Sequence, residues 1–238
     1  MELRLTAIVL RKKEIGETDR LYTFFTREMG KVQAKAIGVR KPAAKLAAAL
    51  ETLTLSDVTV VRGRGIGKVA GAIAEESFMA LRGEYETLST GLDTASVFDR
   101  LVGLEQPDER LFFMLSEYLS LLDGLVHEGK MPLTPLLTEA FFIRLFDELG
   151  YRIEADACAA SGGPLSSGNR CFFSPEMGGI VTEEHAGSHS VRIGENAVKL
   201  IRLILGNRLP SILKVRVGGS DLAELTRIRK LFLAHIIG

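Results

Sequence analysis

The stretch RLYTFFTREMGKVQAKAIGV, residues 20–39, decides the fold of the first part of the chain. Its first run, RLYTFFT, is rich in the aromatic and β-branched residues that favour strands. The turn REMG follows, and its Gly30 can adopt the positive φ that many tight turns require. A strand-like pattern then resumes in KVQAKAIGV, so the stretch predicts a β-hairpin.

Similar runs lie on both sides of this hairpin. It is preceded by LRLTAIVLR at residues 3–11 and followed by TLTLSDVTVV at residues 52–61. The glycine-rich turn RGRG then leads to a fifth strand-like run, GKVAGAIAEE, at residues 67–76. Five short strands within about 75 residues predict a small closed barrel, because closure removes exposed sheet edges. The commonest architecture that fits is the five-stranded OB-fold barrel.

The hydrophobic period changes from two to 3.6 after about residue 76, which predicts a helical body. A helix is predicted in PDERLFFMLSEYLSLLDGLVHE, residues 107–128, with Pro107 at its first position. Asp108 and Glu109 are expected in the first turn, where the helix dipole favours anions.

The same design returns in TPLLTEAFFIRLFDELG, residues 134–150, with Thr134 predicted as N-cap and Gly150 as terminator. Helical spacing is also found in two later segments, ENAVKLIRLIL and DLAELTRIRKLFLAHII. Residues 151–190, which precede these two segments, hold clusters of Gly, Pro and Ser and are predicted to be irregular.

The formal net charge is zero, but the charges are unevenly distributed along the chain. Residues 1–70 carry 14 Lys and Arg against seven Asp and Glu, whereas residues 71–150 carry five against 15. Residues 151–238 carry 11 against eight. Such asymmetry indicates a basic module for a polyanion joined to an acidic module with another role.

Part of the positive charge gathers in GVRKPAAKLAAALETLTL, residues 38–55, just before a strand-like run. Three cations fall in or beside this connecting segment: Arg40, Lys41 and Lys45. Tyr22, Phe24 and Phe25 are predicted stacking surfaces, although neighbours on a strand face opposite ways and one phenylalanine must enter the core. OB barrels bind single strands by combining a cationic groove with aromatic platforms. Nucleic-acid binding is therefore favoured over the alternative of ordinary solvated lysines.

No motif indicates an enzyme or a cofactor, because a nucleophile elbow, a HExxH helix, a kinase set and a Walker pair are all absent. The stretch GRGIG, residues 63–67, lacks the spacing of a phosphate-binding loop and predicts a hairpin turn. Apolar runs are shorter than the roughly 18 residues of a membrane span, and the two cysteines fit a reducing compartment. We therefore expect a cytoplasmic protein.

The irregular region raises the question of a zinc site. Four side chains are candidate ligands: Cys158, Cys171, His185 and His189. The histidines have a spacing that zinc sites allow, but the cysteines are 13 residues apart and neither belongs to a CxxC pair. The alternative, which the residue pattern favours, is a metal-free loop with one or two buried thiols.

Five stretches taken together are specific: AIVLRKKEIGETDRLYTFFTREMGKV, AKAIGVRKPAAKLAAALETLTL, RGRGIGKVAGA, FFIRLFDELGY and CFFSPEMGGIV. They resemble the bacterial recombination mediator family RecO, and the resemblance spans nearly the whole chain. It implies an α+β multidomain protein, with an OB-fold nucleic-acid-binding domain at residues 1–78 and a mainly helical domain at residues 79–238. An irregular, degenerate zinc-ribbon-like insert is expected at about residues 151–192 of the helical domain.

In function, the resemblance implies a mediator of DNA repair that is not an enzyme. It implies binding of single- and double-stranded DNA, annealing of complementary strands, and a cytoplasmic, nucleoid-associated location. It also implies work with RecR and single-strand-binding protein to help load RecA. An alternative is a protein-interaction adaptor whose basic barrel binds an acidic segment of a partner instead of DNA.

The expected DNA contacts are basic residues of the barrel: Arg20, Lys35, Arg40, Lys41, Lys45, Arg62, Arg64 and Lys68. A second basic patch is expected in ELTRIRKLF, from three residues: Arg227, Arg229 and Lys230. On a helix, Thr226, Arg227 and Lys230 are predicted to lie near one face while Arg229 points away.

The chain departs from the family pattern in the insert, where many members have two CxxC pairs. Here the first pair is Cys158 with Ser161, and the second falls on Thr182 and His185. Hydroxyl groups are poor zinc donors compared with thiolates. We therefore expect no metal at these degenerate positions.

Overall fold

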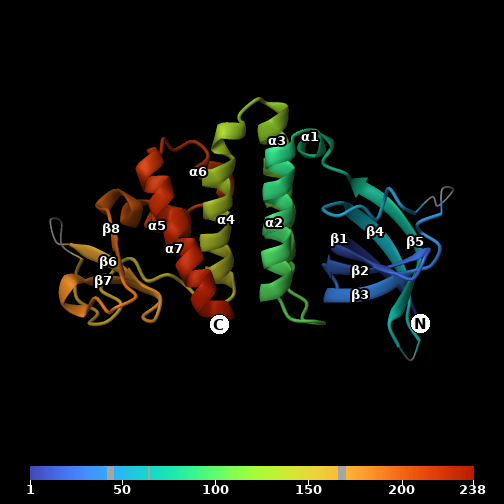
Figure 1. Cartoon of the computed structure of the whole chain (residues 1–238), viewed down its shortest axis with the longest axis horizontal. Helices are drawn as coiled ribbons and strands as arrows, with labels where there is room; N and C mark the ends of the chain where they lie inside the picture. The colour runs from blue at the N-terminus through green and yellow to red at the C-terminus, as the bar shows by residue number, and fades with distance from the viewer. Residues whose placement is uncertain (42–45, 64, 166–169) are drawn as a thin grey trace. The chain divides into compact units, whose positions relative to one another are not determined.

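The computed structural model describes residues 1–41, 46–63, 65–165 and 170–238 (Figure 1). Two of the expected DNA contacts, Lys45 and Arg64, lie outside the described residues. The chain divides into two compact units, Met1–Met131 and Pro132–Gly238. The first unit holds the strands and helices of the N-terminal half, and each unit is described by itself below.

The first unit begins with a closed five-stranded barrel in the order β1-β2-β3-β5-β4, which β1 closes by pairing with β4. Its strands are β1 (Glu2–Ile15), β2 (Asp19–Thr26), β3 (Gly30–Ala36), β4 (Leu55–Val61) and β5 (Gly67–Glu76). The pair β3–β5 is parallel and the other pairs are antiparallel. This confirms the OB-like barrel and the hairpin of β2 with β3, in which Arg20 pairs with Ala36 and Thr26 with Gly30.

Both phenylalanines of β2 are buried, although they point to opposite sides of the sheet. Phe24 packs inside the barrel with Tyr22, their ring centroids 5.7 Å apart. Phe25 faces outward, where Phe98 and Phe112 cover it at centroid distances of 4.8 and 6.5 Å. The prediction that Tyr22, Phe24 and Phe25 are stacking surfaces is therefore wrong, because all three are 0% exposed.

Three helices of the first unit follow the barrel: α1 (Met79–Gly83), α2 (Tyr85–Leu101) and α3 (Glu109–His127). The side chain of Asp108 caps α3, accepting hydrogen bonds from the amides of Arg110 at 2.9 Å and Leu111 at 3.0 Å. Asp108 is thus the N-cap, and Pro107 precedes the helix instead of opening it. The capping carboxylate satisfies amides that have no partner within the helix, and this sets where α3 begins.

The segment between α2 and α3 lies against the start of β3. The Glu105 amide donates to the Lys31 carbonyl at 2.9 Å, and the Lys31 ammonium donates to the Asp99 carbonyl at 2.6 Å. Gly30 has a φ of 67°, and a Cβ atom there would lie 2.0 Å from the Gln106 carbonyl oxygen. Glycine is therefore required at this turn both by its conformation and by the neighbouring chain.

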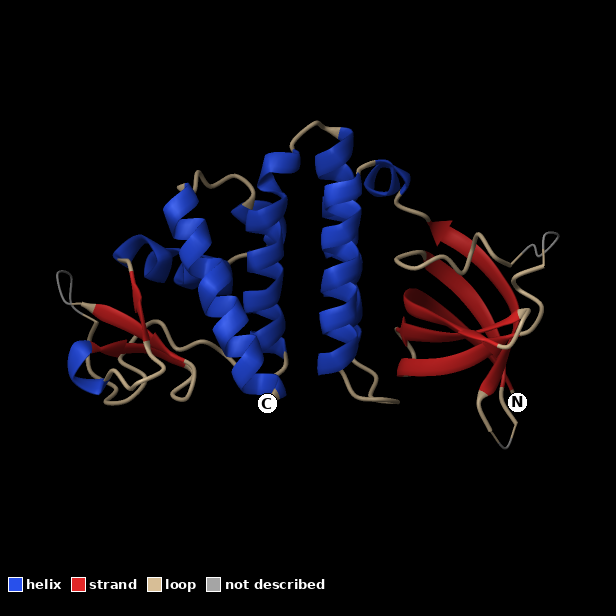
Figure 2. Ribbon diagram, viewed as in Figure 1, coloured by secondary structure: helices blue, strands red, loops and turns tan. Residues whose placement is uncertain are grey.

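The second unit combines helices with a small sheet (Figure 2). Its helices are α4 (Thr134–Glu148), α5 (Glu195–Gly206), α6 (Leu209–Ile212) and α7 (Gly219–Ile237). Its strands, β6 (Cys171–Ser174), β7 (Gly179–Thr182) and β8 (Val191–Ile193), form an antiparallel sheet in the order β7-β6-β8. A 3₁₀ turn, η1 (Met131–Leu133), comes before α4, and another, η2 (Glu183–His185), follows β7.

Two predictions for the second unit need correction. The region predicted as irregular, residues 151–190, contains strands β6 and β7, because PEMGG forms a turn with Gly178 at a φ of 66° and joins two apolar runs. The third strand, β8, follows directly after this region. Thr134 is the first residue of α4 and its hydroxyl makes no capping hydrogen bond, since Leu133 occupies the N-cap.

Phe232 of α7 packs edge-on against Phe146 and Phe173, with centroids at 5.3 and 5.6 Å, so the sheet and the helices share one core.

The described helices are too short or too polar to cross a membrane. Within the ranges given above, none combines the length and the apolar composition that a crossing requires.

Candidate nucleic-acid interface

Three lysines from three strands form a row across the outside of the barrel. Lys13 of β1 pairs with Leu21 of β2, Leu21 pairs with Lys35 of β3, and Lys35 pairs with Lys68 of β5. Residues paired across strands point to the same face of a sheet. Tyr22, next to Leu21, points into the barrel, so this row faces outward. We call Lys13, Lys35 and Lys68 the lysine row.

The spacing of the lysine row follows from sheet geometry. Neighbouring strands are about 4.8 Å apart, so Lys35 and Lys68 are adjacent and Lys13 lies about twice that distance from Lys35. Within the described ranges, neither Lys13 nor Lys68 forms an ion pair. Lys13 was not among the expected contacts. The register identifies it, because Ile15 pairs with Asp19 across the short turn and counting back places Lys13 opposite Leu21.

Asp19 connects the lysine row to the loop that follows β3. Its carboxylate contacts the Lys35 ammonium at 2.9 Å and accepts hydrogen bonds from the Gly38 amide at 2.9 Å and the Thr18 hydroxyl at 3.0 Å. These bonds, the Gly38 amide first, lower the pKa of Asp19 to about 2. The Arg40 amide also donates to the Thr18 carbonyl at 3.0 Å. The start of the segment that carries Arg40 and Lys41 is thus fixed to the β1–β2 turn.

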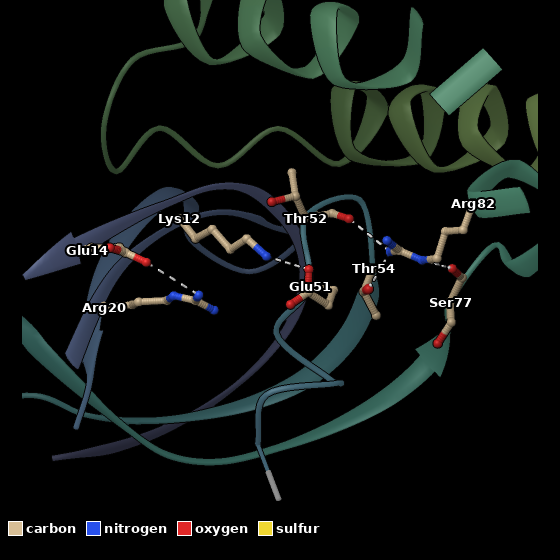
Figure 3. A network of polar contacts seen from close by, with 8 residues as sticks. All are labelled: Lys12, Glu14, Arg20, Glu51, Thr52, Thr54, Ser77 and Arg82. Carbon is tan, nitrogen blue, oxygen red and sulfur yellow. Dashed lines mark hydrogen bonds and ion pairs between the residues drawn. The ribbon is translucent and has the colours of Figure 1, made fainter. Parts of the chain in front are cut away.

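A second cluster of basic side chains, paired with carboxylates, lies where β1 ends and β2 begins (Figure 3). The Glu14 carboxylate contacts Arg40 at 3.3 Å and Arg20 at 3.7 Å, and Lys12 pairs with Glu51 close by. Arg20 and Tyr22 are two residues apart on β2, so their side chains lie on the same side of the sheet. Arg20 therefore points toward the interior side of the barrel and not along the lysine row. Its side chain is 20% exposed.

At the turn between β4 and β5, Arg62 pairs with Glu105 from the segment that precedes α3. Four expected contacts are therefore matched by carboxylates: Arg20, Lys35, Arg40 and Arg62. Lys41 and Lys68 form no ion pair with any residue that the structure describes. The surplus of positive charge in the barrel is thus presented mainly by lysines.

Aromatic platforms are missing from this surface. Residues 1–78 contain four aromatic side chains, Tyr22, Phe24, Phe25 and Phe78, and all four are buried. The exposed apolar side chains near the lysine row are aliphatic. Ile37 after β3 and Ile66 before β5 are each 60% exposed, and Val61, the β4 partner of Lys68, is 42% exposed.

The second basic patch, on α7, is smaller than expected. Arg229 contacts the buried Glu139 carboxylate at 2.8 Å, and its guanidinium lies 4.8 Å from the ring centroid of Phe142. The Thr226 hydroxyl donates to the same carboxylate at 2.9 Å. Thr226 and Arg229 thus share the inward face of α7, which corrects the predicted helix face. Arg227 and Lys230 are exposed.

The four degenerate zinc positions converge in the insert. The Cys158 sulfur lies 4.0 Å from His185 Nδ1, which is 3.0 Å from the Thr182 hydroxyl. Burial alone would raise the pKa of Cys158, but hydrogen bonds from the Ser161 hydroxyl and from the amides of Thr182, Ser161 and Ala160 lower it to about 6. The Cys158 thiolate is therefore stabilised by hydrogen bonds from neighbouring residues of the insert.

This donor set does not fit a structural zinc ion. Zinc–sulfur and zinc–nitrogen bonds of about 2.3 and 2.0 Å place tetrahedral ligands roughly 3.5 Å apart, and two of the four donors here are hydroxyls. His189 instead pairs with Glu176 at 2.6 Å, so the alternative set with Cys158, Cys171 and His185 is not assembled. Among the residues described, no group of three or more His, Cys, Asp or Glu side chains is placed to hold a metal.

Comparison with known proteins gives two family matches that together span nearly the whole chain. The family described as Recombination protein O N terminal matches residues 1–78, and Recombination protein O C terminal matches residues 82–238. The DNA repair protein RecO of Heliobacterium modesticaldum is 36% identical over 235 residues, covering 95% of this chain and 82% of the relative. The RecO protein of a Roseiflexus species is 31% identical over 237 residues, covering 98% and 81%.

Proposed function

Because the chain belongs to the RecO family of DNA repair proteins, we propose that its barrel binds single-stranded DNA through the lysine row. The observation that carries this proposal is the register that aligns Lys13, Lys35 and Lys68 on one outer face. OB barrels bind oligonucleotides on the face of strands 2 and 3, between the loops that join strands 1–2 and 4–5. The lysine row crosses that face.

The chemistry of the surface favours contacts to the phosphates. Lysine ammonium groups neutralise phosphate and release counterions, which supplies affinity without reading the bases. The bases would rest on the aliphatic side chains of Ile37, Ile66 and Val61, which lack a π-face and hydrogen-bonding groups. We therefore expect little sequence preference and a steep dependence of affinity on salt.

The further activities of a mediator need a second contact. We propose that Arg227 and Lys230 on α7 provide one, so that the protein holds two strands and anneals them. In this proposal the protein also binds duplex DNA and works with RecR to help load RecA onto strands coated by single-strand-binding protein. Residues 1–78 and 79–238 are proposed as the DNA-binding and helical domains of this mediator.

A second candidate function is an adaptor that binds an acidic segment of a partner protein. It is favoured by the observation that carboxylates already occupy Arg20, Lys35, Arg40 and Arg62. A polyphosphate strand releases many counterions on binding, whereas a short acidic peptide releases few. The two functions therefore differ in how affinity depends on salt.

The experiment is a titration of the full chain with a labelled 30-nucleotide single strand and, separately, with a labelled acidic peptide, at several salt concentrations. The proposal expects tight binding of the strand at low salt and a slope of log affinity against log salt of about −0.7 for each phosphate contact. Tight binding of the peptide together with no binding of DNA would contradict the proposal and support the adaptor.

A further inference from the structure

Glu14 holds two of the expected DNA contacts at once. Its Oε2 atom lies 3.3 Å from Nη1 of Arg40, and its Oε1 atom lies 3.7 Å from Nη2 of Arg20. Arg20 is the direct cross-strand partner of Glu14, and Arg40 is placed by the hydrogen bond of its amide to Thr18. The carboxylate therefore bridges one guanidinium fixed by the barrel and one fixed by the loop after β3.

A carboxylate and a phosphate recognise a guanidinium in the same way, through its planar fork of N–H donors. Two anions placed on the same donors repel one another, so Glu14 and a DNA phosphate compete for Arg40. Release of the Glu14 carboxylate therefore frees Arg40 for a DNA phosphate, whereas Arg20, which points toward the interior side of the barrel, serves to hold the carboxylate beside Arg40.

The Glu14 carboxylate has fewer contacts than the Asp19 carboxylate, so it can leave its partners more easily. The Asp19 carboxylate is held by a backbone amide and a hydroxyl as well as by Lys35, and its removal would loosen the loop. Glu14 lies near the end of a strand, its side chain is 59% exposed, and in the described part of the chain its contacts are the two arginines. An ion pair whose carboxylate is exposed is weak, and other anions compete with it readily.

From this geometry we propose that Glu14 is an internal competitor of DNA phosphate, which lowers the affinity of the barrel for single strands and favours their release. The inference rests on the proposed function and deepens it. A mediator that transfers a strand to another protein must release that strand, and a carboxylate that returns to Arg40 promotes this step.

The test compares Glu14→Gln with Glu17→Gln in the full chain. Both variants remove one negative charge from the same hairpin, but Glu17 is exposed and makes no ion pair with any described residue. We expect Glu14→Gln to bind a labelled single strand about two- to fivefold more tightly than Glu17→Gln at moderate salt, as the energy of an exposed ion pair implies. Its dissociation rate should fall by a similar factor.

A double-mutant cycle with Arg40→Ala separates competition from a general charge effect. If Glu14 acts by occupying Arg40, Glu14→Gln should gain less affinity in the Arg40→Ala background than in the parent. Equal affinities of Glu14→Gln and Glu17→Gln, with parent-like thermal unfolding, would overturn the inference and leave the proposed function standing. A parent that binds no DNA would overturn both.

Discussion

The amide of Gly38 donates a hydrogen bond to the carboxylate of Asp19, with 2.9 Å between nitrogen and Oδ1. This contact joins the loop after β3 to the turn between β1 and β2. It helps to fix the start of the segment that carries Arg40 and Lys41 to that turn, although Gly38 and Asp19 are 19 residues apart in sequence. The basic surface of the barrel therefore depends on a carboxylate that itself carries negative charge.

The first prediction concerns the pH dependence of stability. The pKa of Asp19 is about 2 in the folded protein against an ordinary value of 3.8. Since the pKa is lowered by folding, Asp19 stabilises the fold fully above pH 4, and this contribution is lost as the pH falls toward 2. Asp19→Asn should lower stability at pH 7 and weaken its decline below pH 4. Urea unfolding at several pH values measures this, with the exposed Asp93→Asn as control, and parent-like pH dependence of Asp19→Asn would contradict it.

The second prediction concerns Gly30. In Gly30→Ala the new Cβ atom would meet the Gln106 carbonyl at 2.0 Å, at a positive φ that alanine avoids. We expect a loss of roughly 2–4 kcal/mol in the free energy of unfolding. Gly16→Ala is the matched control, because Gly16 has a similar φ of 63° but open space around it. Gly16→Ala should lower the free energy of unfolding by about 1 kcal/mol. Equal losses in the two variants would contradict the close contact between Gln106 and the Gly30 turn.

The third prediction concerns zinc. The purified protein should carry no stoichiometric zinc, because Ser161 and Thr182 supply hydroxyls where the family pattern has thiolates. The double variant Ser161→Cys/Thr182→Cys should gain about one zinc per chain, since these positions already converge with Cys158 and His185. Elemental analysis of both proteins checks this. A parent with close to one zinc per chain would contradict the expectation.

The fourth prediction concerns the patch on α7. In the full chain, Arg227→Glu/Lys230→Glu should bind single strands nearly as the parent does but anneal complementary strands coated with single-strand-binding protein more slowly. The matched control is Arg229→Lys, which keeps the charge but weakens the contact with Glu139 and should lower stability instead. Parent-like annealing by the double variant would remove α7 from the mechanism.

The sequence predicts the parts of this structure that depend on local pattern. Alternation and turn residues predict the five strands, and Gly30 predicts the hairpin, because these depend on residues close in sequence. The burial of Phe25 was not predictable in this way, since the helices that cover it lie more than 70 residues further along the chain. Phe25 lies on the outer side of the barrel, where an aromatic ring would form a binding surface if α2 and α3 did not cover it.

The placement of the basic residues also depends on contacts between segments that are far apart in sequence. The charge surplus points to the barrel, but it does not separate Lys13, which lies in the lysine row, from Arg20, which lies beside the interior. That separation depends on the register of β1 with β2. Arg229 was misassigned because its partner Glu139 is 90 residues away, and only the packing of α7 against α4 brings the two together.

One measurement tests the central claim most directly: the salt dependence of single-strand binding by the full-length Lys13→Ala/Lys68→Ala variant. Lys35 is left in place because it pairs with Asp19 and its loss would disturb the loop. The control, Arg100→Ala/Arg110→Ala, removes two exposed positive charges from α2 and α3. The lysine row predicts weaker binding to every sequence tested. It also predicts that the negative slope of log affinity against log salt becomes less steep by about 1.4, at about 0.7 per lost contact. Unchanged slope and affinity in the lysine variant, or an equal loss in the control, would contradict the assignment of this face to DNA.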